Sequence, residues 1–334
     1  MCTAITLTSE AGTSYFGRNL DFGFPTDAHL ISVAAGSRWS SVANGQTVVS
    51  PLAFAGLGQF GTGYPVFLDG VNQAGLAGAA LYFPGYASYS EPSETSEKSQ
   101  VEALDLLRLL LGQCEDLESV REVAEKVQVV GIPNSVTHQT TPMHWIFADR
   151  SGSCLVIEIE KDGCHILEDP VGVLTNSPDL EWHLTNLRNY LQATPEQPAP
   201  VCWSGLSLSA LGQGAGTSRL PGGYTPPERF VRAAFMRANV KVPAEESRAV
   251  AACFHALEPV ALPLGSASDP HGRDFTQYTA FINTDSCTYY LRTYDNPEVV
   301  SASLDELLAT NIAPDQTGAC DHGSINRPTS FPHF

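Results

Sequence analysis

The second residue of the chain, Cys2, is the first candidate for chemistry. Cysteine is small enough for the initiator methionine to be cleaved, which would place a thiol and a free α-amine on one residue. An α-amine has a reference pKa of about 7.7–8.0, so near neutral pH it can carry a proton for its own side chain. Nucleophile and general base would then share one backbone position. The alternative is a cysteine that begins a strand and has no chemical role.

A predicted hairpin would bring two charged residues next to Cys2. Alternating residues predict strands at 2–9 and 14–19, with turn residues between them. The second strand leads to Arg18 and Asp21, so strand pairing would return both to the start of the chain. A guanidinium beside a thiol favours the thiolate, and a carboxylate can hold an α-ammonium by a charge-assisted hydrogen bond. The alternative is a surface Arg–Asp pair, which contributes little to stability.

The elements that must position these residues follow from the hydrophobic periodicity. Further strands are predicted at 29–34, 48–56, 65–68, 76–83, 143–148, 154–160 and 164–167, with a last hairpin at 277–283 and 288–294. Helical periodicity occurs at 101–113, 116–127, 180–191, 226–238 and 244–257. Strands, then helices, then strands again favour an α+β fold of antiparallel sheets. Since no long linker or repeat divides the chain, one layered domain is expected.

The composition excludes several classes of partner. The chain has 334 residues, with 18 Lys and Arg against 36 Asp and Glu, so the formal charge is 18 − 36 = −18. Such a field repels phosphate backbones, and nucleic acid and anionic membrane surfaces are poor partners. No apolar run approaches the ~18 residues of a membrane span, and the first residues lack the basic start and apolar stretch of a signal peptide. A cytoplasmic protein with a small-molecule substrate is expected.

The eight cysteines give no metal pattern. No pair has C-x-x-C spacing, and the Cys/His clusters at 253–255 and 320–322 each lack a second half nearby. Most cysteines are expected to be reduced and buried, because a large chain without a signal peptide needs no disulfides. His138, His144 and His183 are expected to be packed or surface residues rather than ligands. Neither a metal nor an organic cofactor is expected.

Separated motifs along the chain are more specific. They are Met1-Cys2-Thr3, Tyr15-Phe16-Gly17-Arg18-Asn19-Leu20-Asp21, Asp69-Gly70-Val71-Asn72, Gly75-Leu76, Phe83-Pro84-Gly85-Tyr86-Ala87, Leu174-Thr175-Asn176-Ser177-Pro178, Glu181-Trp182-His183, Asn186-Leu187-Arg188-Asn189-Tyr190, Gly212-Gln213-Gly214-Ala215-Gly216, Leu220-Pro221-Gly222, Pro227-Glu228-Arg229-Phe230-Val231-Arg232, Tyr289-Tyr290 and Thr293-Tyr294-Asp295. In these motifs, over about residues 1–310, the chain resembles the choloylglycine hydrolase family. That family contains bile salt hydrolases and penicillin V acylases with the N-terminal nucleophile fold.

The resemblance implies an architecture that agrees with the predicted elements. It is a four-layer αββα sandwich, in which two antiparallel sheets pack face to face with helices outside. A single domain over 1–313 is expected, with an intersubunit arm at about 195–222 and a loose tail at 314–334. The family is typically homotetrameric, so a homotetramer is expected here.

The resemblance also implies roles for individual residues. Cys2 would be the nucleophile and its own base, Arg18 and Asp21 would flank it, and Arg229 would support the site from the start of a helix. Asn176 would donate an amide N–H to the oxyanion of a tetrahedral intermediate. Taken alone, Asn176 would more often be a turn asparagine before a proline.

The resemblance implies a linear amide hydrolase with one of two candidate substrates, penicillin V or a conjugated bile salt. Bile salt hydrolases commonly carry asparagine at the position of Tyr82. Penicillin V acylases of Gram-positive type carry tyrosine there, as this chain does. We therefore expect a penicillin V acylase, with a conjugated bile salt hydrolase as the alternative and a non-catalytic oligomeric binding protein as a further one. The Tyr82 backbone N–H would complete the oxyanion hole, unless the ring is a core aromatic. The residues expected to recognise the acyl group are Phe22, Phe24, Phe60, Tyr82 and Ile132.

Overall fold

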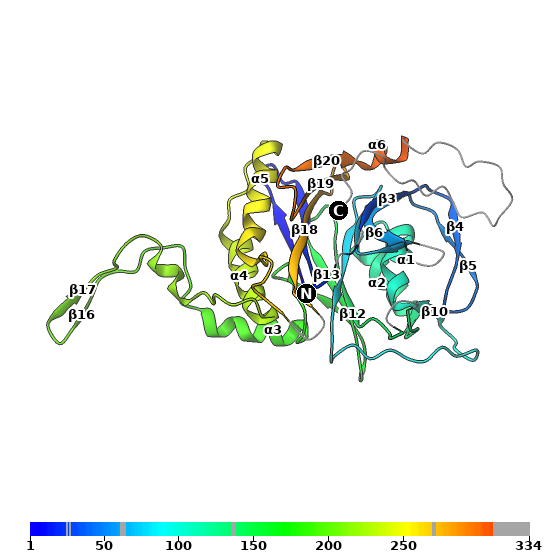
Figure 1. Cartoon of the computed structure of the whole chain (residues 1–334), viewed down its shortest axis with the longest axis horizontal. Coiled ribbons are helices and arrows are strands. Elements are labelled where there is room, and N and C mark those ends of the chain that lie inside the picture. The colour runs from blue at the N-terminus through cyan, green and yellow to red at the C-terminus, as the bar shows by residue number, and fades with distance from the viewer. Residues whose placement is uncertain (25, 27, 61–64, 135–137, 269–271, 310–334) are drawn as a thin grey trace.

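The predicted N-terminal hairpin lies in the middle of an antiparallel sheet. The computed structural model describes residues 1–309 except 25, 27, 61–64, 135–137 and 269–271 (Figure 1). In sheet order the strands are β15 (Val173–Leu174), β1 (Cys2–Thr8), β2 (Ser14–Phe22), β18 (Phe275–Asn283), β19 (Thr288–Thr293) and β20 (Val300–Ser303). Within β1 and β2, Cys2 faces Leu20 and Ala4 faces Arg18. The hairpin prediction is confirmed, and β1 and β2 have neighbours on both sides.

A second antiparallel sheet packs against the first. Its strands, in order, are β14 (Gly163–Glu168), β13 (Cys154–Glu160), β12 (Met143–Ala148), β9 (Ala77–Tyr82), β8 (Asp69–Asn72), β6 (Phe54–Phe60) and β3 (His29–Val33), with β7 (Pro65–Phe67) paired to β6. Because side chains alternate along a strand, β12 serves two cores. Ile146 and Ala148 belong to the core that includes the first sheet. Trp145 and Phe147 belong to a second core, which the second sheet forms with the helices at 106–113 and 117–126.

Helices cover the outer face of each sheet. α4 (Pro226–Asn239) contacts β1 and α5 (Glu246–Leu257) contacts β2 and β18, while α1 (Leu106–Gln113) contacts β8 and β9 beside α2 (Leu117–Lys126). Figure 1 shows the two helix layers on opposite sides of the sheets. The four-layer αββα sandwich predicted from the resemblance is confirmed. α3 (Leu180–Asn186) lies beside α4, and α6 (Leu304–Ala309) contacts β3 and β6.

Local signals set the helix starts correctly. Pro226 occupies the first turn of α4, where a missing N–H costs nothing. The Asp116 side chain accepts the Ser119 N–H at 2.8 Å and caps α2, as predicted.

Several predicted boundaries are wrong where tertiary pairing overrides local pattern. The predicted helix at 101–113 starts only at Leu106, because Ser99–Glu102 forms β10, which pairs in parallel with β11 (Val127–Val130). The predicted strand at 48–56 is two strands, because β5 (Thr47–Ser50) pairs with β4 (Ser37–Ser40) and β6 joins the second sheet. The helix predicted to reach residue 191 ends at Asn186 and continues as a 3₁₀ turn, Leu187–Tyr190.

A hairpin projects from the body at the place predicted for an arm. β16 (Val201–Trp203) and β17 (Leu206–Leu208) form its tip, well away from the sheets (Figure 1). The Thr194 N–H donates to the Gly216 carbonyl at 3.1 Å and closes the base of the arm. The tail predicted at 314–334 and the domain boundary at residue 313 lie outside the described residues, so the single domain over 1–313 stays a prediction.

Two further findings bear on the sequence expectations. No helix in the described part of the chain is long and apolar enough to cross a membrane, and the cytoplasmic location stays a prediction. The seven cysteines that the structure describes are free, and Cys164 and Cys202 are exposed rather than buried.

Candidate active site

Strand register places Arg18 against the thiol of Cys2. Cys2, Ala4 and Arg18 lie on one face of the hairpin, because Ala4 is opposite Arg18 and two residues from Cys2. Arg18 Nη2 donates to Cys2 Sγ at 2.8 Å, and the two side chains are 1% and 4% exposed. Burial alone would lower the pKa of Arg18, but the attraction of Cys2, Tyr278 and Asp69 outweighs it, and the pKa lies above the usual value. A buried positive charge therefore faces the sulfur.

Asp69 holds that guanidinium from the second sheet. Its Oδ2 lies 3.8 Å from Arg18 Nε and accepts the Tyr278 hydroxyl at 2.6 Å, and its Oδ1 accepts the Tyr289 hydroxyl at 3.1 Å. Burial raises the pKa of Asp69, and Arg18 opposes the rise. Asp69 belongs to one of the sequence motifs, but no role was predicted for it. The available signal was an acidic residue directly after the apolar run 65–68, because a carboxylate that is buried needs a partner.

Arg229 organises the other side of Cys2. It reaches from the first turn of α4 to donate to the Cys2 carbonyl, to Thr3 Oγ1 at 2.6 Å and to Asn176 Oδ1 at 2.7 Å. Burial lowers the pKa of Arg229, while nearby Asp21 opposes the change. A buried guanidinium with three such acceptors is a fixed part of the site.

Asp21 is fully buried next to Arg229. Its Oδ1 accepts the Thr276 hydroxyl at 2.6 Å, and its Oδ2 lies 3.8 Å from Arg229 Nη1. Among the described residues, Oδ2 has no hydrogen-bond partner. Burial raises the pKa of Asp21, and Arg229 is the largest opposing influence. One carboxylate oxygen thus stays available for a further donor.

Asn176 joins the nucleophile strand to the second sheet. Its Oδ1 accepts the Cys2 N–H at 2.9 Å, and its Nδ2 donates to the Tyr82 carbonyl at 2.7 Å. A side-chain amide carries two N–H groups, so one remains for another acceptor. The residue is 2% exposed. A turn asparagine bonds to its own neighbouring backbone, whereas the side chain of Asn176 bonds to two distant segments of the chain.

Tyr82 ends β9 with its backbone turned toward Asn176. The Phe83 N–H donates to the Pro142 carbonyl at 2.9 Å, so Tyr82 occupies the neighbouring position of the antiparallel ladder, where N–H and C=O point away from β12. The Tyr82 side chain is 38% exposed. The alternative of a core aromatic is therefore wrong.

Besides Tyr82, the residues predicted to recognise the acyl group lie in three separate segments. Phe22, the last residue of β2, and Phe24 form an edge-to-face pair with ring centroids 4.5 Å apart. Ile132 is half-buried in the loop after β11. Phe60 is the last residue of β6, and its side chain lies outside the described part of the structure.

The N-terminus is present with Met1 attached. The Met1 ammonium donates to the Asp21 carbonyl at 2.6 Å and lies 3.5 Å from Asp274 Oδ2. In this form the nitrogen of Cys2 is a peptide N–H and not an amine.

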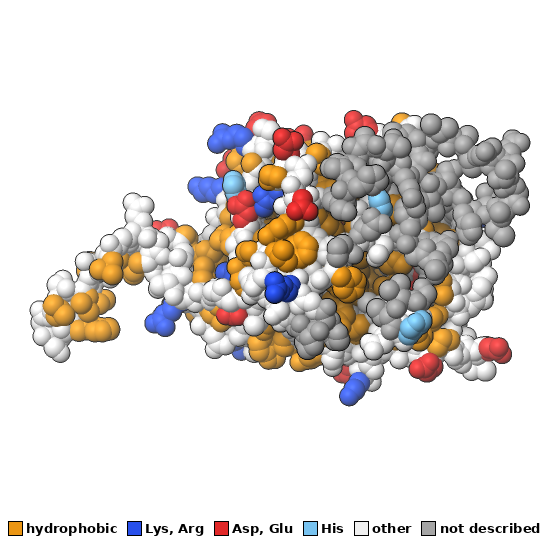
Figure 2. Space-filling view, viewed as in Figure 1, with side chains coloured by type: hydrophobic (Ala, Val, Ile, Leu, Met, Phe, Trp, Pro, Cys, Tyr) orange, Lys and Arg blue, Asp and Glu red, His pale blue; other side chains and the backbone are white. Residues whose placement is uncertain are grey.

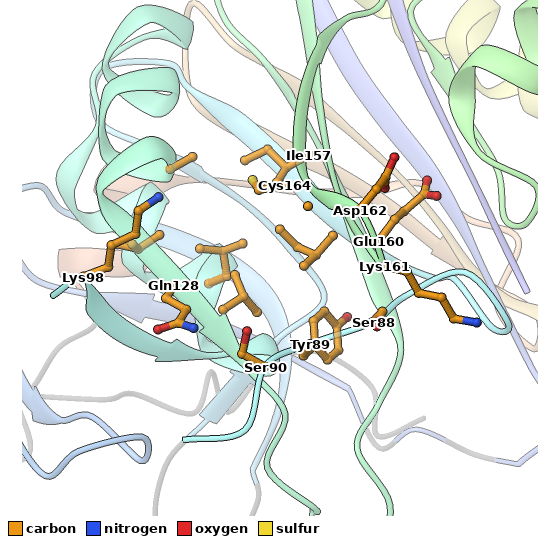
Figure 3. Close-up of a pocket in the computed structure, with 16 residues that line it drawn as sticks. Ser88, Tyr89, Ser90, Lys98, Gln128, Ile157, Glu160, Lys161, Asp162 and Cys164 are labelled. Carbon is orange, nitrogen blue, oxygen red and sulfur yellow. The ribbon is translucent and has the colours of Figure 1, made fainter. Parts of the chain in front are cut away.

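A cavity lies away from Cys2. It measures about 450 Å³ and is lined by residues from β11, α2, β13 and β14 (Figure 3). The exposed residue Cys164 lines it, and partial burial of its thiol raises the pKa of Cys164, which disfavours the thiolate. None of the predicted catalytic residues lines it. In the part of the chain that the structure describes, no group of three His, Cys, Asp or Glu side chains could hold a metal ion.

Known proteins are similar to this chain in sequence and in fold. The family model described as linear amide C–N hydrolases, choloylglycine hydrolase family, matches residues 2–319. The bile salt hydrolase/transferase of Clostridium perfringens is 32% identical over 92% of this chain and 93% of that protein. The conjugated bile acid hydrolase of Lactobacillus acidophilus is 33% identical over 92% of this chain and 96% of that protein.

Solved structures of related enzymes have the same fold as this chain. The C2A mutant of the conjugated bile acid hydrolase from Clostridium perfringens has a TM-score of 0.86 at 30% identity, covering 98% of this chain and 96% of that one. The penicillin V acylase of Agrobacterium tumefaciens has a TM-score of 0.72 at 20% identity, covering 91% and 87%, which shows the fold alone.

A four-layer sandwich with a cysteine at the start of a central strand defines the class of N-terminal nucleophile hydrolases. The chain belongs to the choloylglycine hydrolase family of linear amide C–N hydrolases. The predicted family and the prediction of an amidohydrolase are confirmed, and these findings disfavour the alternative of a non-catalytic binding protein.

Proposed function

We propose that this enzyme hydrolyses conjugated bile salts, at the amide that joins glycine or taurine to the bile acid, with Cys2 as the nucleophile. The observation that carries the mechanism is the Arg18 Nη2 contact to Cys2 Sγ at 2.8 Å in a buried site. A cation at this distance favours the thiolate, which is the reactive form of cysteine.

The proposed reaction begins with removal of Met1, which turns the Cys2 nitrogen into an α-amine. The thiolate attacks the amide carbonyl carbon, and the second N–H of Asn176 Nδ2 and the Tyr82 N–H hold the oxyanion. The C–N bond then breaks as the α-ammonium gives its proton to the leaving nitrogen. Water, deprotonated by the amine, attacks the thioester, and the carboxylic acid leaves as the thiolate is restored.

The buried charges fit this mechanism. Arg18 lies near the Asp69 carboxyl group and Arg229 near the Asp21 carboxyl group, so each buried cation has an acidic partner. A thiolate and an α-ammonium on Cys2 would add no net charge. Arg18 would stabilise the thiolate, and the unpartnered Oδ2 of Asp21 is available to the ammonium. The low dielectric of a buried site strengthens both interactions.

Two lines of support differ on the substrate. The curated relatives that are 32–33% identical over nine-tenths of the chain are named for bile salts or conjugated bile acids, and this shifts the expectation away from penicillin V. The exposed ring of Tyr82 keeps penicillin V as a second candidate, because Tyr82 contacts Asn176 through its backbone and its ring can stack on a phenoxy group.

We expect the wild-type enzyme to cleave glycocholate and taurocholate with a higher kcat/KM than penicillin V. In Tyr82→Asn the ratio of glycocholate to penicillin V should rise about 2–10-fold, which corresponds to the ~0.5–1.5 kcal/mol of one aromatic pair. Steady-state kinetics of both variants on the three substrates measures this.

The exposed tyrosine Tyr294 provides the matched control, because Tyr294→Asn should leave the substrate ratio unchanged. A wild-type preference for penicillin V would overturn the substrate proposal but not the Cys2 chemistry. An unchanged ratio in Tyr82→Asn would remove Tyr82 from substrate selection.

We also propose that the arm packs against a second copy of the chain, in the homotetramer implied by the resemblance. The hairpin at its tip exposes apolar side chains, Val201, Trp203 and Leu206, to 50%, 69% and 63% (Figure 2). Clustered exposed apolar side chains are typical of an interface.

The double variant Trp203→Glu, Leu206→Glu should therefore shift a wild-type tetramer to smaller species in light scattering coupled to size exclusion. Leu264→Glu, at an exposed leucine elsewhere, should not. A monomeric wild type, or a double variant that still forms tetramers, would contradict the proposed role of the arm.

A further inference from the structure

Two buried histidines lie behind the proposed oxyanion hole. His183, from α3, places Nε2 at 2.8 Å from the carbonyl oxygen of Asn176. His144, from β12, places Nε2 at 3.2 Å from the carbonyl oxygen of Thr175. Both side chains are completely buried. The expectation that they are packed residues is correct, but each also contacts the backbone next to the proposed oxyanion donor.

The hydrogen-bond partner of His183 fixes which of its ring nitrogens donates. Burial lowers the pKa of His183 to about 4, so the ring is neutral near pH 7. A carbonyl oxygen only accepts, so the Nε2 of His183 must carry the proton. Its Nδ1 has no hydrogen-bond partner among the described residues, which agrees with that tautomer.

His144 is fixed by a buried carboxylate. Its Nδ1 lies 3.0 Å from Glu158 Oε1, and the Glu158 oxygens also accept the Leu180 N–H at 3.2 Å. Since α3 starts at Leu180, Glu158 connects His144 to the helix that carries His183. The two histidines therefore belong to one buried network.

Aromatic stacking fixes the two ring planes. Phe230 stacks on His183 with centroids 4.5 Å apart, and Phe83 stacks on His144 at 4.2 Å. Phe83 directly follows Tyr82, the other proposed oxyanion donor. The network thus reaches both segments that line the oxyanion position, 82–83 and 175–176.

We propose that His183 and His144 are positioning residues, which hold Asn176 and Tyr82 at the separation that the tetrahedral intermediate requires. The proposal rests on the proposed Cys2 hydrolysis. A donor displaced by about 1 Å can cost a factor of about 10² in rate. The histidines act through the backbone and do not touch the substrate.

The test compares a variant that lacks the His183 Nε2–H donor with a variant that restores an N–H donor at that position. In His183→Leu we expect kcat on the best amide substrate to fall about 10–100-fold, with KM within about threefold, because the contact matters most in the transition state. His183→Gln can place an amide N–H near the position of Nε2, and it should recover at least half of that loss on a logarithmic scale.

Two binding measurements separate positioning from general damage. An aldehyde analogue of the acyl group adds to Cys2 and forms an oxyanion, so its affinity for His183→Leu should fall by the factor lost in kcat/KM. Alkylation of Cys2 by iodoacetamide needs no oxyanion hole, so its rate should stay within about twofold of wild type. If His183→Leu does not fold, Glu158→Gln, which keeps the side-chain volume, should give the same pattern more weakly.

The matched control is Phe147→Leu, which removes buried atoms from the other face of β12. It should lower the melting temperature and leave kcat unchanged. The proposal is overturned if His183→Leu keeps wild-type kcat, if Gln is as slow as Leu, or if alkylation falls in step with kcat. If wild type cleaves none of the amides, the proposed function fails, and aldehyde affinity alone decides the role of the histidines.

Discussion

Cys2→Ala should abolish amide hydrolysis, with kcat falling at least about 10⁴-fold, as expected for loss of a covalent nucleophile. The fold should survive, because Cys2 is a small buried residue at the start of β1. Arg18 would lose its contact to sulfur but keep the Leu68 carbonyl at 2.8 Å, the Ala80 carbonyl at 3.2 Å and Asp69. Steady-state kinetics and thermal unfolding together measure both effects.

The matched control is Cys114→Ala, at a buried cysteine that follows α1. It should keep full activity. Cys2→Ser should be very slow, because a hydroxyl is far less acidic than a thiol. Residual activity of Cys2→Ala near the wild-type level would remove Cys2 from the mechanism.

The same mechanism predicts the mass of the active protein. Intact mass spectrometry should show a chain that begins at Cys2, since the α-amine exists only after Met1 is removed. Chemical blocking of that amine should stop turnover. A fully active enzyme that still carries Met1 would rule out the Cys2 amine as the base.

Asn176→Ala is expected to lower kcat about 10²–10³-fold, the usual effect of losing one oxyanion donor. The substitution also removes Oδ1, which accepts from the Cys2 nitrogen and from Arg229. Asn176→Asp keeps an oxygen at that position and removes the Nδ2 donor, and it also places a carboxyl group beside Arg229. Both variants should therefore show a large loss in kcat.

Asn239→Ala, at the exposed C-terminal end of α4, is the control and should have no effect on kcat. A rise in KM with kcat within a few-fold of wild type would make Asn176 a substrate-binding residue and contradict its oxyanion role.

The sequence determined the elements whose signals are local. Alternation and turn residues predict the β1–β2 hairpin, and pairing across it suffices to bring Arg18 and Asp21 back toward Cys2. Pro226 and Asp116 mark helix starts because proline and a capping carboxylate act within one turn. The motifs added Asn176 and Arg229, which no local pattern would have placed beside Cys2.

Tertiary structure alone decided which distant residues complete the site. Asp69 meets Arg18 only because the two sheets pack face to face, and the sheet spacing is not encoded in either strand. His183 contacts the Asn176 carbonyl because α3 docks there, and His144 contacts the Thr175 carbonyl from β12 in the second sheet.

The same reason explains the errors at element boundaries. β10 replaces the start of a predicted helix because β11, more than twenty residues later in the chain, supplies its hydrogen bonds. A local pattern specifies which face of a strand or helix is apolar. Packing of the whole chain decides which other strand or helix that face contacts. Apolar surface and paired charges are fully buried only when all four layers are in place.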